Sequence, residues 1–96
     1  MSKRFPVAHL HEQGADMIIV PLDDDFDLKL EEEKHQTKEA LQMCASSAGL
    51  RGTVVPVWMA RNGRMTFIAP RPWHPFFASL SMGAVQANLN RELICG

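Results

Sequence analysis

The sequence contains few cysteines and no long apolar run. Cys44 and Cys95 are the only cysteines among its 96 residues, whereas a disulfide framework usually has several pairs. The two cysteines could bridge, but a reducing compartment and the absence of further pairs favour free thiols, and we expect a cytoplasmic protein. No apolar stretch approaches the ~18 residues that span a bilayer, and no signal-peptide pattern is present. A membrane partner is not expected.

The motifs of common catalytic and nucleotide-binding sites are also missing. There is no Gly-x-Ser-x-Gly, Walker or dinucleotide-binding fingerprint. Cys44 belongs to the apolar stripe of a predicted helix and Cys95 is the penultimate residue, so neither is placed as a nucleophile beside a histidine. These absences favour a module that is not an enzyme and carries no cofactor.

Lysine is absent from the second half of the chain, and the charges are split. Residues 23–39 carry eight acids against three lysines, a net charge of −5, while residues 40–96 carry five arginines against one acid, a net charge of +4. The pI of about 6.4 argues against a nucleic-acid partner, because such proteins have a strongly basic surface. A solvated acidic helix explains the split, as does an acidic face on one copy that meets a basic face on another.

The length and composition are those of one small globular domain. The chain is 46% hydrophobic and 22% charged, and 96 residues leave room for a single core. A domain of this size buries only about 60–65% of its unfolded surface, so self-association would add needed burial. Residues 1–15 lack a consistent period and are predicted to form a flexible N-terminal arm, which leaves residues 16–96 as the domain.

Two elements are indicated in the first half of the domain. Residues 17–22 are a short apolar run rich in β-branched side chains, which predicts a strand buried on both faces. Apolar residues then recur at three-to-four spacing over residues 30–48, which predicts an amphipathic helix. Glu31, Glu32 and Glu33 suit its first turn, and Gly49 suits the left-handed position after its last turn.

A β-hairpin is predicted around Asn62-Gly63, since this dipeptide lies between two apolar runs, 53–60 and 64–69. A two-residue turn places Arg61 opposite Arg64 and Trp58 opposite Phe67. Both hairpin faces are apolar. Pro56 cannot donate to a ladder, so the first run is predicted to be an edge strand with the second as its inner neighbour.

Two helices are predicted after the hairpin. His74-Pro75 suits the start of a short helical turn that continues to about residue 80. Ser81 can cap a final helix over residues 82–94, where apolar side chains recur at three or four positions.

The predicted fold class is α+β, a two-layer α/β sandwich of order β-α-β-β-α. Its three-stranded mixed sheet has the order 1-3-2, because the third strand can lie between the first two, antiparallel to both, and Pro56 favours this order. Both helices are predicted to lie on one face. The opposite face then needs a cover. A second copy of the chain or another protein would provide it, and so would residues 69–77 together with the N-terminal arm.

Neither cluster of possible metal ligands has the spacing of a known metal site. His9, His11, Glu12 and Asp16 do not follow a zinc pattern. The aspartates of residues 23–27 lack the glycine and the final glutamate of a calcium loop, and a helix-capping role for Asp25 or Asp27 explains them better. No metal site is therefore predicted.

Residues 69–77 hold the densest group of constrained and ligand-capable side chains. His74 is a plausible acid–base group, although catalysis needs a second group beside it. Cationic and aromatic side chains near it suit an anion or a partner surface. The candidate ligand- or partner-binding residues are Arg71, Trp73 and His74, with Arg61 and Arg64 at the hairpin tip and Trp58 on a hairpin face.

The sequence therefore predicts a small cytoplasmic interaction or regulatory module that forms a homodimer or binds a protein partner. The alternative is a site that binds a small ligand or an anion, or that is catalytic, and that is built around Arg71, Trp73 and His74.

Overall fold

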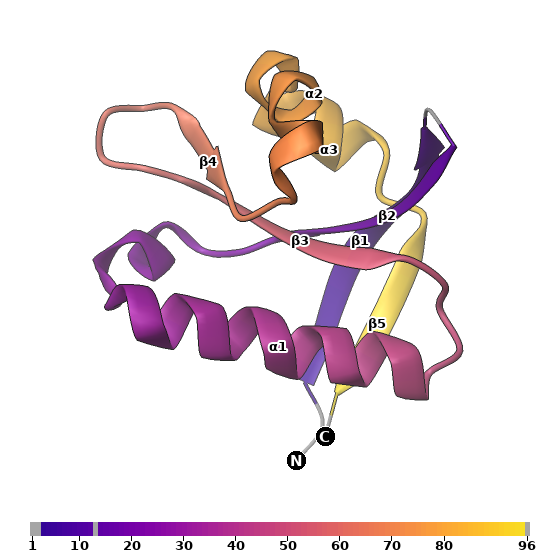
Figure 1. Ribbon diagram of the computed structural model, residues 1–96. Coiled ribbons are helices and arrows are strands. Elements are labelled where there is room, and N and C mark those ends of the chain that lie inside the picture. The colour runs from indigo at the N-terminus through magenta and orange to yellow at the C-terminus, as the bar shows by residue number, and fades with distance from the viewer. Residues whose placement is uncertain (1–2, 13, 96) are drawn as a thin grey trace.

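Five strands form a mixed sheet in the computed structural model, which describes residues 3–12 and 14–95 (Figure 1). The spatial order is β4-β3-β2-β1-β5, in which β2 and β3 are parallel and the other neighbours are antiparallel. The small α+β domain with a mixed sheet is confirmed, but the three-stranded sheet of order 1-3-2 is wrong. The strands are β1 (Lys3–Glu12), β2 (Ala15–Pro21), β3 (Thr53–Met59), β4 (Met65–Phe67) and β5 (Arg91–Cys95).

The helices cover both faces of the sheet, not one as predicted. Helix α1 (Glu31–Ser47) covers one face, and α2 (His74–Ser79) and α3 (Met82–Ala87) lie on the other (Figure 1). Short 3-10 helices precede α1 and α2, η1 (Asp24–Leu28) and η2 (Arg71–Trp73). Alternate residues of the apolar strands enter two cores, since Ile18 packs on the α1 side and Ile19 on the α2–α3 side. The three layers therefore leave neither face of β2 and β3 as the open surface on which the homodimer prediction depended.

The prediction of a flexible N-terminal arm is wrong, because residues 3–12 form strand β1 between β2 and β5. Val7 and Ala8 are completely buried on opposite faces of the sheet. Residues 3–7 pair with β5, and residues 8–12 pair with β2. Met1, Ser2 and Gln13 of the predicted arm lie outside the described residues.

The predicted final helix over residues 82–94 ends at Ala87, and the chain then forms β5. Ser81 caps α3 as predicted, since its Oγ accepts a hydrogen bond from the Ala84 N–H at 3.1 Å. Asn90 then joins β1, because its side chain accepts from the His9 N–H at 2.8 Å and donates to the His9 carbonyl at 2.9 Å. These bonds start the β1–β5 ladder at the point where a longer helix was expected.

The hairpin forms, but its register is shifted by one residue from the prediction. Val57 lies opposite Phe67 and Trp58 opposite Thr66. The Ala60 N–H donates to the Arg64 carbonyl at 2.9 Å, which leaves a three-residue loop, and Gly63 at its end has a φ of +79°. Because side chains alternate along a strand, the shift moves Phe67 to the face of Val57, opposite to that of Trp58.

Pro56 does not make β3 an edge strand, because β3 lies between β2 and β4. The Pro56 carbonyl accepts from the Ile68 N–H at 3.1 Å, but Pro56 has no N–H to return, which agrees with the end of β4 at Phe67. Next to it, the Gln42 side chain of α1 accepts from the Val54 N–H at 2.8 Å and donates to the Gly52 carbonyl at 3.0 Å. The short strand β4 is therefore the edge of the sheet. Further along β3, the Gln42 side chain makes the hydrogen bonds that a longer β4 would otherwise make.

The strand predicted over residues 17–22 and the helix predicted over 30–48 are confirmed as β2 and α1. Gly49 follows α1 with a φ of +79°, as expected. Neither Asp25 nor Asp27 caps this helix, because Leu30 is its N-cap residue and the Glu33 side chain accepts from the Leu30 N–H at 3.1 Å.

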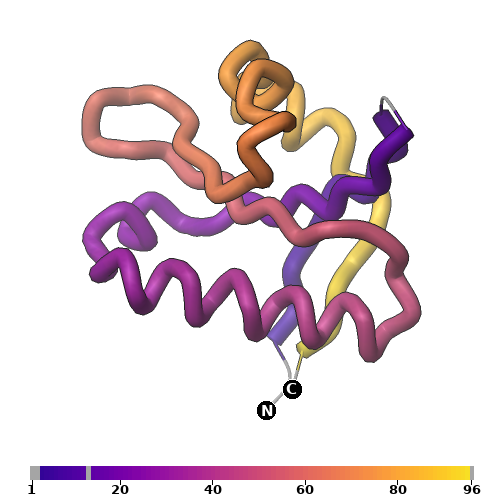
Figure 2. The backbone as a smooth tube through the Cα atoms, in the orientation of Figure 1, coloured from indigo at the N-terminus to yellow at the C-terminus, as the bar shows by residue number. Residues whose placement is uncertain are grey.

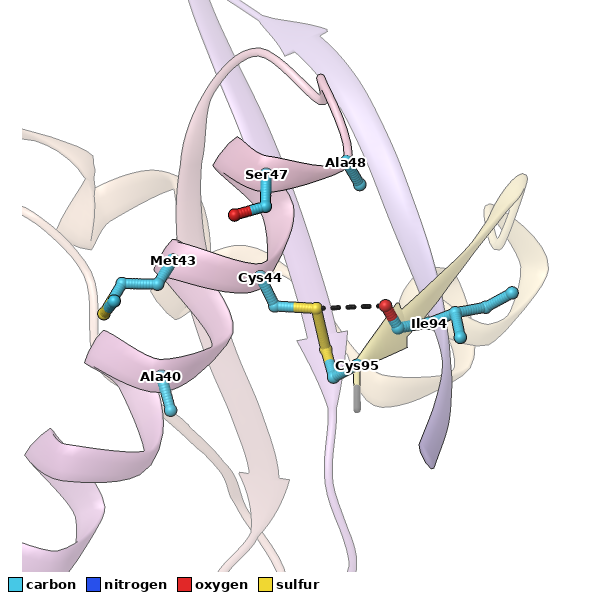
Figure 3. Close-up of a pocket in the computed structure, with 7 residues that line it drawn as sticks. All are labelled: Ala40, Met43, Cys44, Ser47, Ala48, Ile94 and Cys95. Atoms are coloured by element: carbon cyan, nitrogen blue, oxygen red, sulfur yellow. Dashed lines mark hydrogen bonds between the residues drawn. A yellow bond between two sulfur atoms is a disulfide. The ribbon is translucent and has the colours of Figure 1, made fainter. Parts of the chain in front are cut away.

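The two cysteines, predicted as free thiols, form a disulfide (Figure 3). Cys44 lies in the last turn of α1 and Cys95 in β5, and their Cα atoms are 5.7 Å apart. The bond closes a loop across a sequence separation of 51 residues, which on loop entropy alone stabilises the fold by about 4 kcal/mol.

Candidate functional site

The six predicted site residues do not gather at one place. Trp58 is buried on the α1 side of the sheet, where its Nε1–H donates to Asp27 Oδ1 at 3.1 Å. Its ring meets the Phe26 ring at a centroid distance of 4.9 Å, and the Lys34 Nζ lies 5.5 Å from the ring centroid. These contacts make Trp58 an anchor between β3, η1 and α1.

Arg61 and Arg64 are exposed at the β3–β4 loop, and Arg61 acts on Asp27 of the acidic segment. The hydrogen bond from the Trp58 indole holds the pKa of Asp27 below its ordinary value of 3.8, and the backbone and charge of Arg61 act in the same direction. The loop and η1 are therefore joined around one carboxylate.

Arg71, Trp73 and His74 lie together on the α2–α3 side of the sheet, opposite to Trp58. The His74 Nε2–H donates to the Ala69 carbonyl at 2.9 Å, and the ring stands edge-on to Phe67 with centroids 5.3 Å apart. Trp73 is half-buried against the core of this face. One His74 nitrogen thus holds the chain after β4, and a ligand role for the three residues stays a prediction.

The histidines of β1 make separate contacts at the far end of the β1–β2 hairpin. The His11 Nδ1–H donates to Asp16 Oδ1 at 2.7 Å, and the His9 Nε2–H donates to the Arg51 carbonyl at 2.7 Å. The hydrogen bond from His11 lowers the pKa of Asp16. Within residues 3–12 and 14–95, no three His, Cys, Asp or Glu side chains gather in a way that could hold a metal ion.

Strand β5 is a feature that the sequence prediction missed entirely. It lies at the end of the strand order, so its inner side pairs with β1 while its outer side has no neighbouring strand in the described part of the chain. Leu93 is buried in the α1-side core, whereas Ile94 is 53% exposed. Arg4 and Glu92 form an exposed ion pair at 3.0 Å near the start of the strand. The end of β5 has no comparable pair among the described residues and carries an exposed apolar side chain.

A shallow surface cavity of about 480 Å³ lies beside β5, between it and the last turns of α1. Figure 3 shows the disulfide between the two elements, with the Met43 and Ile94 side chains pointing away from each other. Cys44 Sγ lies 3.2 Å from the Ile94 carbonyl oxygen. Both cysteines of the disulfide are half-buried and line this cavity. The cavity is lined by Ala40, Met43, Cys44, Ser47, Ala48, Ile94 and Cys95.

Comparison with protein-family models, curated proteins and solved structures finds no match to this chain. Among the helices of the described residues, none combines the length and apolar character needed to cross a membrane. A functional assignment therefore depends on the geometry of the chain itself.

Proposed function

We propose that the protein is an interaction module that forms a homodimer through the outer edge of β5. The observation that carries this proposal is an edge strand whose outer side has no neighbouring strand in the described chain and which presents Ile94 to solvent. Such an edge is a template for another strand, and proteins that keep it unpaired usually protect it with charge. The other edge strand, β4, has only three residues and offers a much shorter ladder.

A second copy suits this edge because an antiparallel strand can pair with itself about a two-fold axis. An axis at Leu93 places that residue opposite its own copy and Glu92 opposite the partner's Ile94. All five residues of β5 are then paired. An axis at Glu92 would place two carboxylates directly opposite each other, which is unfavourable. Charge and strand length therefore select Leu93 as the centre.

The proposed pairing also covers exposed apolar surface. Ile94 lies on the sheet face opposite to Leu93, across from Arg4 of β1. In the dimer, the aliphatic part of the partner's Glu92 would lie against Ile94, with its carboxylate still near the arginine of its own copy. The two sheets would join into one of ten strands.

The test is sedimentation equilibrium of the oxidised protein at micromolar concentration, with matched lysine variants. Ile94→Lys puts a charge on the proposed edge and is expected to weaken the dimer at least tenfold. Leu28→Lys is the control, because Leu28 is 61% exposed in η1, at the other end of α1. A wild-type protein that stays monomeric, or a dimer weakened equally by both variants, would contradict the proposal.

A further inference from the structure

We propose that the Cys44–Cys95 disulfide is a redox-sensitive clasp that holds the edge strand β5 on α1. The bond joins the last turn of α1 to the last described residue of β5. Breaking it would leave the strand attached by its pairing with β1 and by the packing of Leu93. The clasp thus acts on one terminal element of the fold.

The segment that the clasp secures has limited support of its own. The β1–β2 register begins at Ala8, whereas β5 pairs with residues 3–7 of β1. Figures 1 and 2 show that these two segments run side by side and diverge from β2 and β3. A two-stranded ribbon is marginally stable unless it packs on something else. Here the ribbon packs on α1, and the disulfide is the covalent tie between them.

The chemistry of reduction is accessible at this position. Both cysteines are half-buried and line the surface cavity shown in Figure 3, where a small dithiol can reach them. Exchange with a dithiol breaks the S–S bond and forms two protein thiols, while the dithiol gives up two electrons and two protons and becomes a cyclic disulfide.

The surroundings of Cys44 determine whether its sulfur is a thiol or a thiolate after reduction. The negative end of the α1 dipole disfavours a thiolate there. The resulting thiol is placed to donate a hydrogen bond to the Ile94 carbonyl, which lies 3.2 Å from Sγ. This weak hydrogen bond replaces only part of the stabilisation that the disulfide gave to the contact between β5 and α1. Reduction is therefore expected to leave β5 docked on average but opening far more often.

The size of the effect follows from the loop that the disulfide closes. A sequence separation of 51 residues corresponds to a loop entropy equivalent to roughly a thousandfold change in an equilibrium constant. Local opening of β5 releases part of that constraint, so the exchange of its amide hydrogens should accelerate by up to about a thousandfold.

The experiment is amide hydrogen exchange on the full chain, with and without dithiothreitol, at a dilution where any dimer has dissociated. We expect faster exchange in β5 and in residues 3–7, with little change in β3 or around Val85 of α3. The double variant Cys44→Ser/Cys95→Ser should exchange like the reduced protein and should not respond to the dithiol. Equal exchange in both redox states would overturn the clasp. Simultaneous loss of protection in every strand would also overturn it, because the bond would then stabilise the whole fold.

A second consequence rests on the proposed function, because an edge that opens often is a poorer template for a partner strand. Reduction should then weaken the dimer at least tenfold in sedimentation. Different results would contradict each of the two proposals. A monomer whose β5 exchange responds to the dithiol contradicts only the dimer, whereas a dimer with β5 equally protected in both redox states contradicts only the clasp.

Discussion

Among the glycines of residues 3–12 and 14–95, Gly52 is the one at which an added Cβ would meet the closest contacts. Its φ is +134°, and a Cβ placed there would lie 2.7 Å from the backbone oxygen of Asp16 and 2.9 Å from its carbonyl carbon. The obstacle is the backbone of the buried strand β2, which cannot move aside like a flexible side chain. The change would also disturb the Gly52 carbonyl, which accepts from Gln42 at 3.0 Å.

The expected cost has two parts. A non-glycine residue in a sparsely populated backbone region costs about 1–3 kcal/mol, and overpacking against fixed atoms costs about 1–3 kcal/mol more. Gly52→Ala should therefore lower the free energy of unfolding by about 2–6 kcal/mol. The matched control is Gly63→Ala, because Gly63 also has a positive φ of +79° but nothing within 4 Å of the added carbon. This control should lose only about 1–2 kcal/mol.

Urea unfolding followed by circular dichroism gives both free energies on the same scale. The prediction is that Gly52→Ala is the less stable variant by at least about 1 kcal/mol. Equal losses in the two variants would show that residues 51–53 can move away from β2, and would refute the close approach on which the reasoning depends.

Two further predictions concern carboxylates. Replacement of Trp58 by Phe removes the indole donor that is the main cause of the lowered pKa of Asp27, so the pKa should rise toward 3.8; a carboxyl NMR titration that shows no rise would contradict this. The folded-state pKa of Asp16 is lowered below 3.8 by His11, so its contribution to stability is present above 3.8 and is lost as the pH falls through the folded value. His11→Gln should therefore lose less stability on acidification than the wild type, measured as urea midpoints, while His35→Gln, an exposed control on α1, should behave like the wild type.

The elements that the sequence predicted correctly are those with strong local signals. Residues 17–22 are uniformly apolar because β2 is buried on both faces, and the three-to-four spacing of residues 30–48 follows the buried side of α1. The Asn62-Gly63 dipeptide predicts the hairpin, but it fits both a two-residue turn and the end of a three-residue loop. The register therefore needed backbone hydrogen bonds that no local pattern records.

Strands β1 and β5 were missed because their residues have no pattern that is specific to a strand. In β1, the apolar residues Val7 and Ala8 are followed by His9 and His11, and the segment looks like a polar terminus. In β5, Leu93 stands four residues after Leu89, a spacing that also fits a helix. The two strands stabilise each other through contacts between the chain ends, which local sequence patterns do not encode.

The predicted site residues illustrate the same limit. Arg71, Trp73 and His74 are close in sequence and stay close in the fold. Trp58 lies on the other side of the sheet, where its indole N–H donates to Asp27. The disulfide joins residues 51 positions apart, and its geometry depends on β5, which was itself missed. A strand edge built from such long-range contacts becomes visible only in three dimensions.

The most direct test of the proposed interface is an isotope-filtered nuclear Overhauser experiment on a dimer mixed from labelled and unlabelled oxidised protein. Pairing about Leu93 predicts contacts between Glu92 of one copy and Ile94 of the other, and between the two Leu93 backbones. Contacts between copies that arise only from α1 or from η2 and α2, or no contacts between copies at all, would contradict the proposed use of the β5 edge.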